Sequence, residues 1–429
     1  MAGMPRRRRA IRGWAAERWG ELGPGLITGA SDNDPSGITT YSVAGAATGY
    51  GLLWMAVLTM PLLVAVQSMA ARVGAVKEEG LGQVIEDRFG RPWLVASIVV
   101  LLTANTATIA ADLGGVAAGV HLLVPVPIKI VIPVVGLALL AVEVFWSYRR
   151  FATVIKWLTL VLFLYILSGF AARPDWGKVL TGTFVPHLSL SKEFVGSAVA
   201  ILGTTISPYM FFWITSQESE EEAADDGPDE DDDERTSGAA ERARRRDVIA
   251  GMGYANLVFY FIVLANAATL GARHVKITTA AQAAGALTPI VGRFDTVLFA
   301  IGLIGAGLIA VPVLAGSAAY PLAELFNWKE GLDNPLRRAP GFYAVIAAAV
   351  IVGVGGNFLG VDPVKGLVYA AVLQGFLAPL LIVLLTVIAR DADVMGRHRN
   401  GWFDTTFGFI AAAVMAAAAI TLVAVTIFG

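Results

Sequence analysis

The chain has 429 residues, of which 56% are hydrophobic and 15% are charged, and its formal net charge at pH 7 is −2. A soluble protein carries charge on about a quarter of its residues. This composition therefore excludes an ordinary soluble protein, and the charge balance gives no reason to expect a nucleic-acid partner. Cysteine is absent, which excludes disulfides and thiolate metal ligands. We expect an all-α protein that crosses a membrane many times.

Apolar stretches predict about eleven membrane-spanning helices. The arginines of the N-terminal segment, residues 1–21, indicate a cytoplasmic anchor rather than a cleaved signal peptide. With this end inside the cell, most of the 32 Lys and Arg residues fall on the cytoplasmic side, as the positive-inside rule requires. The odd number of spans then places the C-terminus outside the cell membrane. The predicted spans are residues 22–48, 51–75, 93–122, 128–147, 151–171, 194–217, 247–270, 293–325, 341–360, 363–389 and 402–428.

The first span contains an aspartate, Asp34, that is followed at once by a proline. A carboxylate inside a membrane span is costly and is usually functional. The proline interrupts the helix and frees backbone carbonyls that can bind a cation. Ser31 would face the same cavity as Asp34 if the helix continued that far, and Gly37 leaves space for water or an ion. Asp32 and Asn33 add polarity that lipid would not tolerate. A polar kink that only packs helices is the alternative.

The sixth span contains a similar break at Ser207, which a proline also follows. Thr204 and Ser207 are three residues apart and offer a carbonyl and hydroxyls, and Tyr209 offers a phenol. All of these are oxygen groups, although such residues also hydrogen-bond helices together. Met210 could supply sulfur, but a methionine at such a position more often packs in the core.

Five spans separate the two breaks, and interrupted helices in corresponding positions are typical of transporters built from an inverted repeat. The predicted halves are residues 22–171 and 194–389, and residues 402–428 form one extra helix. The segment 217–247 contains a run of Asp and Glu followed by arginines, a composition typical of a disordered cytoplasmic loop. A regulatory or cation-attracting loop is the alternative to a solvated linker.

Two further polar residues lie within predicted spans. Gln374 is a third candidate ligand, although a glutamine within a membrane span as often forms a hydrogen bond between helices. Asp112 is a second buried acid, which could pair with Arg337 or Arg338 at the start of the ninth span. All four histidines fall in loops or at span ends, which argues against a histidine proton relay and an imidazole-rich metal site near the breaks. They are His121, His187, His274 and His398.

Around these residues the chain resembles the Nramp family of divalent-metal transporters. The similar segments flank the two breaks and are residues 22–25 (Leu-Gly-Pro-Gly), 44–46 (Ala-Gly-Ala), 50–54 (Tyr-Gly-Leu-Leu-Trp) and 201–203 (Ile-Leu-Gly). The resemblance covers nearly the whole chain. It implies the leucine-transporter-type fold, in which spans 1–5 and 6–10 are inverted repeats, and a metal site that includes Asp34.

The chain departs from this family at positions linked to metal choice. Typical members have Asp-Pro-Gly-Asn and Met-Pro-His at the two breaks, where this chain has Asp-Pro-Ser-Gly ending at Gly37 and Ser-Pro-Tyr beginning at Ser207. A glutamate that the family links to proton transport is replaced in span 3 by Gly115. The chain keeps Asp34 but loses the sulfur ligand and part of the proton path. This pattern resembles the Nramp-related magnesium transporters.

Mg²⁺ prefers hard oxygen ligands and gives up its waters reluctantly. We therefore expect a carrier in the lipid bilayer that takes up Mg²⁺, and also Mn²⁺, as a largely hydrated ion without obligatory proton coupling. We expect no cofactor and no obligate protein partner. A proton-coupled Mn²⁺/Fe²⁺ importer and an organic-substrate carrier of the same fold are the alternatives. An enzyme is not expected, because an intramembrane aspartyl protease needs a second acid that the segment 353–357 lacks.

Overall fold

The computed structural model describes residues 24–145, 163, 165–224, 238–287, 295–332 and 334–428. Within these residues the regular structure is entirely helical. The predicted N-terminal segment 1–21 and most of the predicted fifth span lie outside the described residues. The helices are α2 (Pro24–Asp32), α3 (Pro35–Thr48), α4 (Trp54–Lys77), α5 (Leu81–Phe89), α6 (Arg91–Leu123), α7 (Ile128–Phe145), α9 (Trp176–Phe184), α10 (Lys192–Thr205), α11 (Pro208–Ala224), α13 (Gly238–Thr269), α14 (Ala280–Ala284), α16 (Asp295–Phe326), α17 (Pro340–Gly356), α18 (Pro363–Arg390), α19 (Ala392–Met395) and α20 (Trp402–Phe428).

The helices follow the predicted spans closely. Eight helical stretches of the described residues are long and apolar enough to cross a membrane. The first predicted span is divided into α2 and α3, and the fourth is α7. The all-α membrane fold that the sequence predicts is therefore confirmed. The boundaries of the two inverted halves, residues 22–171 and 194–389, stay a prediction.

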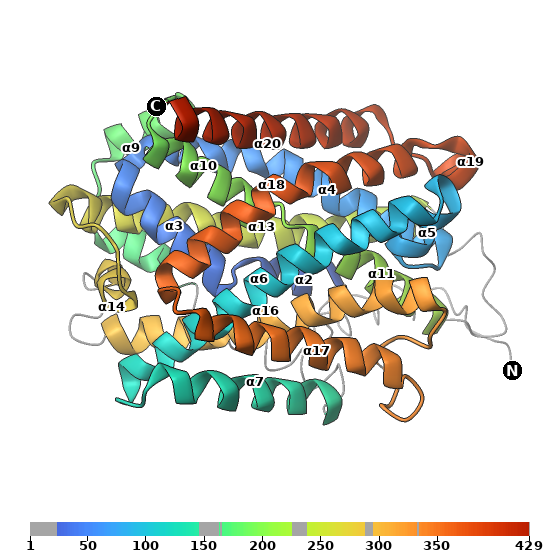
Figure 1. The fold of residues 1–429 in the computed structure, drawn as a ribbon. Helices are drawn as coiled ribbons and strands as arrows, with labels where there is room; N and C mark the ends of the chain where they lie inside the picture. Colours follow the sequence, from blue (N-terminus) through green and yellow to red (C-terminus); the bar gives the residue numbers. More distant parts are fainter. Residues whose placement is uncertain are drawn as a thin grey trace, which may run out of the picture.

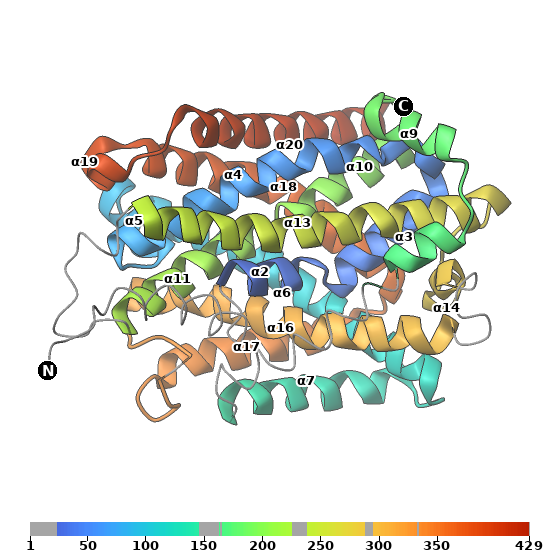
Figure 2. The ribbon, with the colours of Figure 1, turned by 180° about the vertical axis from the view of Figure 1, so that it is seen from behind.

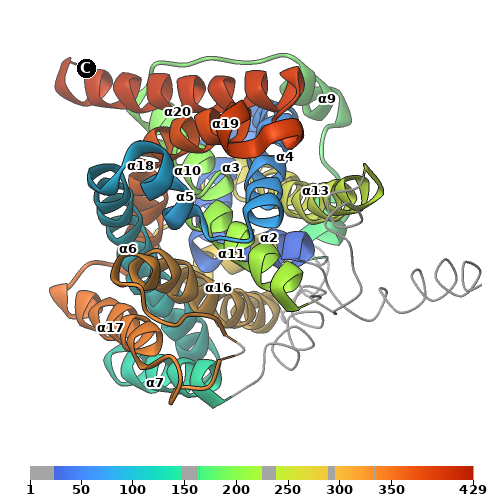
Figure 3. The same cartoon turned by 90° about the vertical axis from the view of Figure 1, so that its right-hand side faces the viewer.

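The long helices run roughly side by side, with α20 at one edge of the bundle and α7 at the opposite edge (Figure 1 and Figure 2). Seen along the bundle, the short helices on either side of the two breaks lie near the middle, and α7, α17 and α20 lie at the periphery (Figure 3). Helices α5 and α19 lie at one end of the bundle, and α9 and α14 lie at the other (Figure 1). The breaks are thus surrounded by protein.

Glycines allow the short helix α2 to lie against α13. A Cβ atom added at Gly29 would lie 2.2 Å from the carbonyl oxygen of Gly251, and one added at Gly251 would lie 2.0 Å from that of Gly25. Small residues permit this approach of two backbones inside a membrane. At the start of α2, the carboxylate of Asp247 on α13 accepts a hydrogen bond from the N–H of Gly25 at 2.7 Å, which satisfies a donor that a helix start leaves open. These contacts hold α2, and with it the first break, in place.

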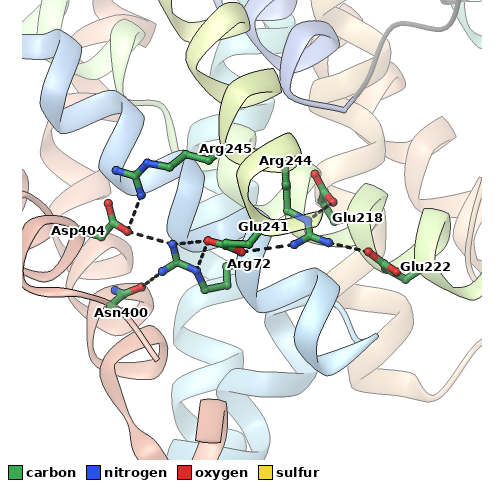
Figure 4. Close-up of polar contacts among 8 residues, drawn as sticks. All are labelled: Arg72, Glu218, Glu222, Glu241, Arg244, Arg245, Asn400 and Asp404. Carbon is green, nitrogen blue, oxygen red and sulfur yellow. Dashed lines mark hydrogen bonds and ion pairs between the residues drawn. The ribbon is translucent and has the colours of Figure 1, made fainter. Parts of the chain in front are cut away.

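The charged segment 217–247 is helical at both ends, which corrects the expectation of disorder there. Its first residues continue α11 and its last residues begin α13, whereas residues 225–237 lie outside the described part. The two extensions bind each other, because Arg244 donates to Glu218 at 2.8 Å and to Glu222 at 2.7 Å (Figure 4). Charge-assisted hydrogen bonds of this kind are among the stronger ones in proteins.

A second arginine, Arg72 of α4, joins the same network, and its side chain is 9% exposed. It donates to Glu241 of α13 at 2.7 Å, to Asn400, and to Asp404 of α20 at 3.1 Å (Figure 4). Arg245 donates to the same carboxylate of Asp404 at 2.9 Å. The network therefore ties α4, α13 and α20 together at one end of the bundle.

Candidate functional site

The first break separates α2 from α3. Helix α2 ends at Asp32, Asn33 and Asp34 lie between the helices, and α3 begins at Pro35. The backbone of Asp34 is extended (φ −68°, ψ 170°), and its carboxylate accepts a hydrogen bond from the N–H of Gly37. An aspartate cap followed by proline at the first helical position is a strong helix start. The sequence therefore begins a new helix here, with a buried carboxylate at its cap.

The second break separates α10 from α11 at Ile206 and Ser207, before Pro208. The hydroxyl of Ser207 donates to the carbonyl oxygens of Gly203 and Thr204 at 2.8 and 2.9 Å. It thereby satisfies carbonyls that the end of α10 leaves open. The sequence predicts this hydroxyl as a ligand. The structure commits its hydrogen to α10, so only its oxygen lone pairs remain for a ligand.

The two breaks meet at Gly37. A Cβ atom placed on Gly37 would lie 3.1 Å from Oδ1 of Asp34, 3.1 Å from Oγ1 of Thr204 and 3.2 Å from the carbonyl oxygen of Asp32. A carboxylate, a hydroxyl and a carbonyl thus crowd the small space in which even a Cβ atom would fit tightly. The carbonyl belongs to the last residue of α2, where the helix dipole is negative. The structure brings together the predicted residues Asp34, Thr204 and Gly37 and surrounds this space with oxygen.

Tyr209 and Ser31 connect the two breaks. The phenol of Tyr209 donates to the carbonyl oxygen of Ser31 at 2.9 Å, and the hydroxyl of Ser31 donates to Thr28 within α2 at 2.8 Å. The Ser31 carbonyl that the sequence predicts as a freed ligand therefore already accepts a hydrogen bond. Because α2 ends at Asp32, Ser31 and Asp34 do not share one helix face. The carbonyl beside the shared space is that of Asp32.

Gln374 of α18 is buried, and its side-chain N–H donates to the hydroxyl of Thr108 on α6 at 2.7 Å. Such a hydrogen bond between helices is the predicted alternative to a role as a ligand. The side-chain oxygen of Gln374 has no hydrogen-bond partner among the described residues. One oxygen of this residue therefore remains available to a ligand.

Asp112 of α6 is fully buried beside the start of α3. Its Oδ1 accepts a hydrogen bond from the N–H of Ser36 at 3.1 Å, and its Oδ2 has no partner in the described part of the chain. The predicted ion pair with Arg337 or Arg338 is wrong, because both arginines are exposed in the segment before α17. Asp112 is instead a second acid next to the first break.

The soft ligands are placed as the sequence predicts. Met210 is buried in the hydrophobic core. Each of the four histidines lies at a helix end or between helices, so none is close in sequence to a break. His121 is in the last turn of α6, His187 lies between α9 and α10, His274 follows α13, and His398 follows α19.

Asp32 and Asn33 are candidate binding residues that the sequence did not single out as ligands. Both are buried, and neither oxygen of Asp32 and neither polar atom of the Asn33 amide has a hydrogen-bond partner among the described residues. Buried polar groups are almost always hydrogen-bonded, so these atoms mark a place that a ligand or water completes. No three His, Cys, Asp or Glu side chains of the described residues come close enough to hold a metal ion together. A cation here would need carbonyl, hydroxyl or water oxygens beside carboxylates.

Comparison with known proteins identifies the family of this chain. The family model described as natural resistance-associated macrophage protein-like matches residues 25–425. The chain belongs to the Nramp family. The divalent metal cation transporter MntH of Deinococcus radiodurans is 28% identical to it over 413 residues, which are 92% of this chain and 87% of that protein. Such relatives are named as transporters and not as enzymes.

Solved structures share the fold of this Nramp chain. The manganese transporter of Eremococcus coleocola has a TM-score of 0.71 at 20% identity, over 94% of this chain and 86% of that chain. MhsT, solved in complex with L-phenylalanine, has a TM-score of 0.60 at 12% identity, over 95% of this chain and 98% of that chain. The predicted leucine-transporter-type fold of a multi-pass membrane protein is therefore confirmed.

Proposed function

We propose that this Nramp-family chain is a carrier that takes up divalent metal cations, with Mg²⁺ as its main substrate and Mn²⁺ as a second one. The ion passes largely hydrated and moves down its electrochemical gradient without obligatory proton coupling. The carrier resides in the cell membrane with its N-terminus in the cytoplasm and its C-terminus outside. The relatives named as divalent metal cation transporters support the substrate class.

One observation supports the choice of Mg²⁺: the groups that lie close around Gly37, from Asp34, Thr204 and Asp32, all present oxygen atoms. Mg²⁺ binds through one or two carboxylates and keeps several waters, and it prefers hard oxygen ligands of the kind found here. Ser207 offers no sulfur at the second break, and sulfur is the ligand that favours softer ions.

The packing of Gly115 supports transport without obligatory proton coupling. A Cβ atom on Gly115 would lie 2.9 Å from the Cβ of Pro35, so a glutamate at this position would require α3 or α6 to shift. The chain therefore lacks a carboxylate there and has no space for one in this arrangement. The absence of this carboxylate impairs a proton relay. Asp34 and Asp112 remain near the break as titratable groups.

A proton-coupled Mn²⁺ importer is the second candidate. The Eremococcus coleocola structure is named as a manganese transporter, and Asp112 has one oxygen without a partner in the described residues. An organic-substrate carrier such as MhsT, which was solved with an amino acid, is disfavoured because the Asp34 carboxylate would repel a substrate carboxylate.

The deciding experiment reconstitutes the protein in liposomes and compares Mg²⁺, Mn²⁺ and Ca²⁺ influx while a trapped dye reports internal pH. We expect Mg²⁺ and Mn²⁺ influx without stoichiometric acidification. An inside-negative potential should accelerate it, because each elementary charge gains about 2.3 kcal/mol per 100 mV. Liposomes with Asp34→Asn protein are the matched control. Acidification that follows metal uptake and disappears without metal would overturn the uncoupled mechanism and favour the second candidate.

A further inference from the structure

Asp32 is the buried acid of the first break that the protein itself does not satisfy. Asp32 is 1% exposed, and both of its carboxylate oxygens lack a hydrogen-bond partner among the described residues. Asp34, by contrast, accepts a hydrogen bond from Gly37, and Asp112 accepts one from Ser36. A buried carboxylate without a partner is strongly destabilising. The chain therefore tolerates at Asp32 a cost that it avoids at the other two acids.

The surroundings of Asp32 contain further oxygen groups and negative charge. Its carboxylate interacts electrostatically with the carboxylate of Asp34 and with the phenols of Tyr41 and Tyr209. Tyr41 is held by a contact of 3.1 Å to the hydroxyl of Thr205, and Tyr209 is held by the Ser31 carbonyl. Neighbours of this kind give the Asp32 carboxylate no compensating charge. A cation bound beside the oxygen atoms around Gly37 would supply one.

The reach of a hydrated ion determines how Asp32 can act. The described acids are too far apart for three of them to ligate one ion directly. A magnesium ion lies about 2.1 Å from a coordinated water, and a carboxylate that accepts a hydrogen bond from this water lies about 2.7 Å further on. A carboxylate can therefore hold a hydrated ion from about 4 to 5 Å away without displacing its water.

We propose that Asp32 is a second carboxylate of the cation site, which accepts hydrogen bonds from the water shell of the ion while Asp34 lies nearer to the ion. The carboxylates of Asp34 and Asp32 together then match the charge of a divalent cation. This inference rests on the proposed function, since it assigns to one residue the selection of a hydrated divalent ion.

The test uses cobalt(III) hexaammine, a cation that cannot exchange its ligands and is about the size of hydrated Mg²⁺. It can bind through hydrogen bonds to its ammine shell but cannot bind a carboxylate directly. Transport of Mg²⁺ and Mn²⁺ into liposomes is measured with increasing hexaammine for the wild type, Asp32→Asn and Asp32→Glu. Asp362→Asn is the matched control, because this exposed acid caps α18 rather than α3 and asparagine caps helices equally well.

We expect hexaammine to inhibit the wild type and the control equally. In Asp32→Asn the inhibition constant and the KM for Mg²⁺ should each rise about tenfold, and the KM for Mn²⁺ should rise less, because Mg²⁺ is the more reluctant of the two to lose water. Asp32→Glu should keep the inhibition, because it keeps the charge. If Asp32→Asn elutes as aggregated protein, Asp32→Ser, which also removes the charge, replaces it in the comparison with the wild type.

Hexaammine without effect on the wild type, or equal inhibition of wild type and Asp32→Asn, would overturn the role of Asp32. Loss of inhibition in Asp32→Glu would overturn it as well. A wild type that moves Mn²⁺ but not Mg²⁺ refutes the proposed preference for Mg²⁺. In that case the competition of hexaammine with Mn²⁺ still reports on Asp32, so the two failures are distinguishable.

Discussion

Asp34 has two separable tasks, and a pair of substitutions distinguishes them. Its carboxylate caps α3 through the N–H of Gly37, and it is one of the oxygen groups around the space at that glycine. Asparagine retains the cap but removes the charge, whereas alanine removes both. We expect Asp34→Asn and Asp34→Ala each to lower Mg²⁺ and Mn²⁺ influx at least about 100-fold, which corresponds to about 2.7 kcal/mol of lost stabilisation at about 1.36 kcal/mol per tenfold.

The cap alone accounts for the expected difference in stability between the two variants. Loss of an aspartate cap costs about 1 kcal/mol, so Asp34→Ala should lower the Tm in detergent by about 1 to 3 °C, and Asp34→Asn should melt close to the wild type. Asp362→Ala is the matched control, because Asp362 caps α18 through the N–H of Lys365 in an exposed position. It should show the same small loss of Tm with unchanged influx. Influx in Asp34→Asn at the wild-type rate would refute the assignment of this carboxylate to the ion site.

Three further predictions follow from particular contacts. Ser207→Met combined with Gly37→Asn should raise the affinity for Cd²⁺ or Mn²⁺ relative to Mg²⁺ about tenfold, because a sulfur ligand favours softer ions; unchanged relative affinities in calorimetry would place selectivity elsewhere. Arg72→Met removes a buried arginine from three partners in Figure 4 and should lower the free energy of unfolding by about 3 kcal/mol. The exposed control Lys178→Gln should lower it by less than about 1 kcal/mol, and the Tm values of the two variants test this difference. Burial, and then neighbouring carboxylates, raise the pKa of Glu330 from 4.5 to about 9. Protonated Glu330 contributes stability that is fully present below about pH 4.5 and is lost as the pH rises toward 9. The Tm of Glu330→Gln should therefore be a few degrees above that of the wild type at pH 8 and equal to it at pH 4.5. Equal Tm values at pH 8 would contradict this reasoning.

The positions of the two breaks follow from the sequence because proline fixes them locally. Pro35 and Pro208 each begin a helix in the structure, at the two places where the sequence predicts an interruption. The partners of the polar groups at the breaks do not follow from the sequence. The hydrogen bond from Tyr209 to Ser31 joins residues 178 positions apart, and it depends on how two half-helices pack rather than on either segment alone.

The helical ends of the charged segment were mispredicted for a related reason. Composition treats acids and arginines as separate charges that keep a chain solvated. In the structure Glu218 and Glu222 lie one turn apart on α11, and both bind Arg244 of α13. Opposite charges on two helices therefore satisfy each other, which composition cannot indicate. The ion pair predicted for Asp112 was wrong because the pairing partner depends on packing. Asp112 lies next to Ser36, whereas the arginines before α17 are exposed.

The distribution of satisfied and unsatisfied polar groups gives the strongest physical argument for a ligand at the breaks. At the end of the bundle, Arg72 and Arg244 each bind several acceptors (Figure 4). At the centre, Asp32 and Asn33 are equally buried and bind none among the described residues. A membrane interior offers no water to compensate such groups, so these two neighbouring residues require something else to complete them. A hydrated divalent cation supplies both the charge that Asp32 lacks and the donors that carboxylate oxygens accept.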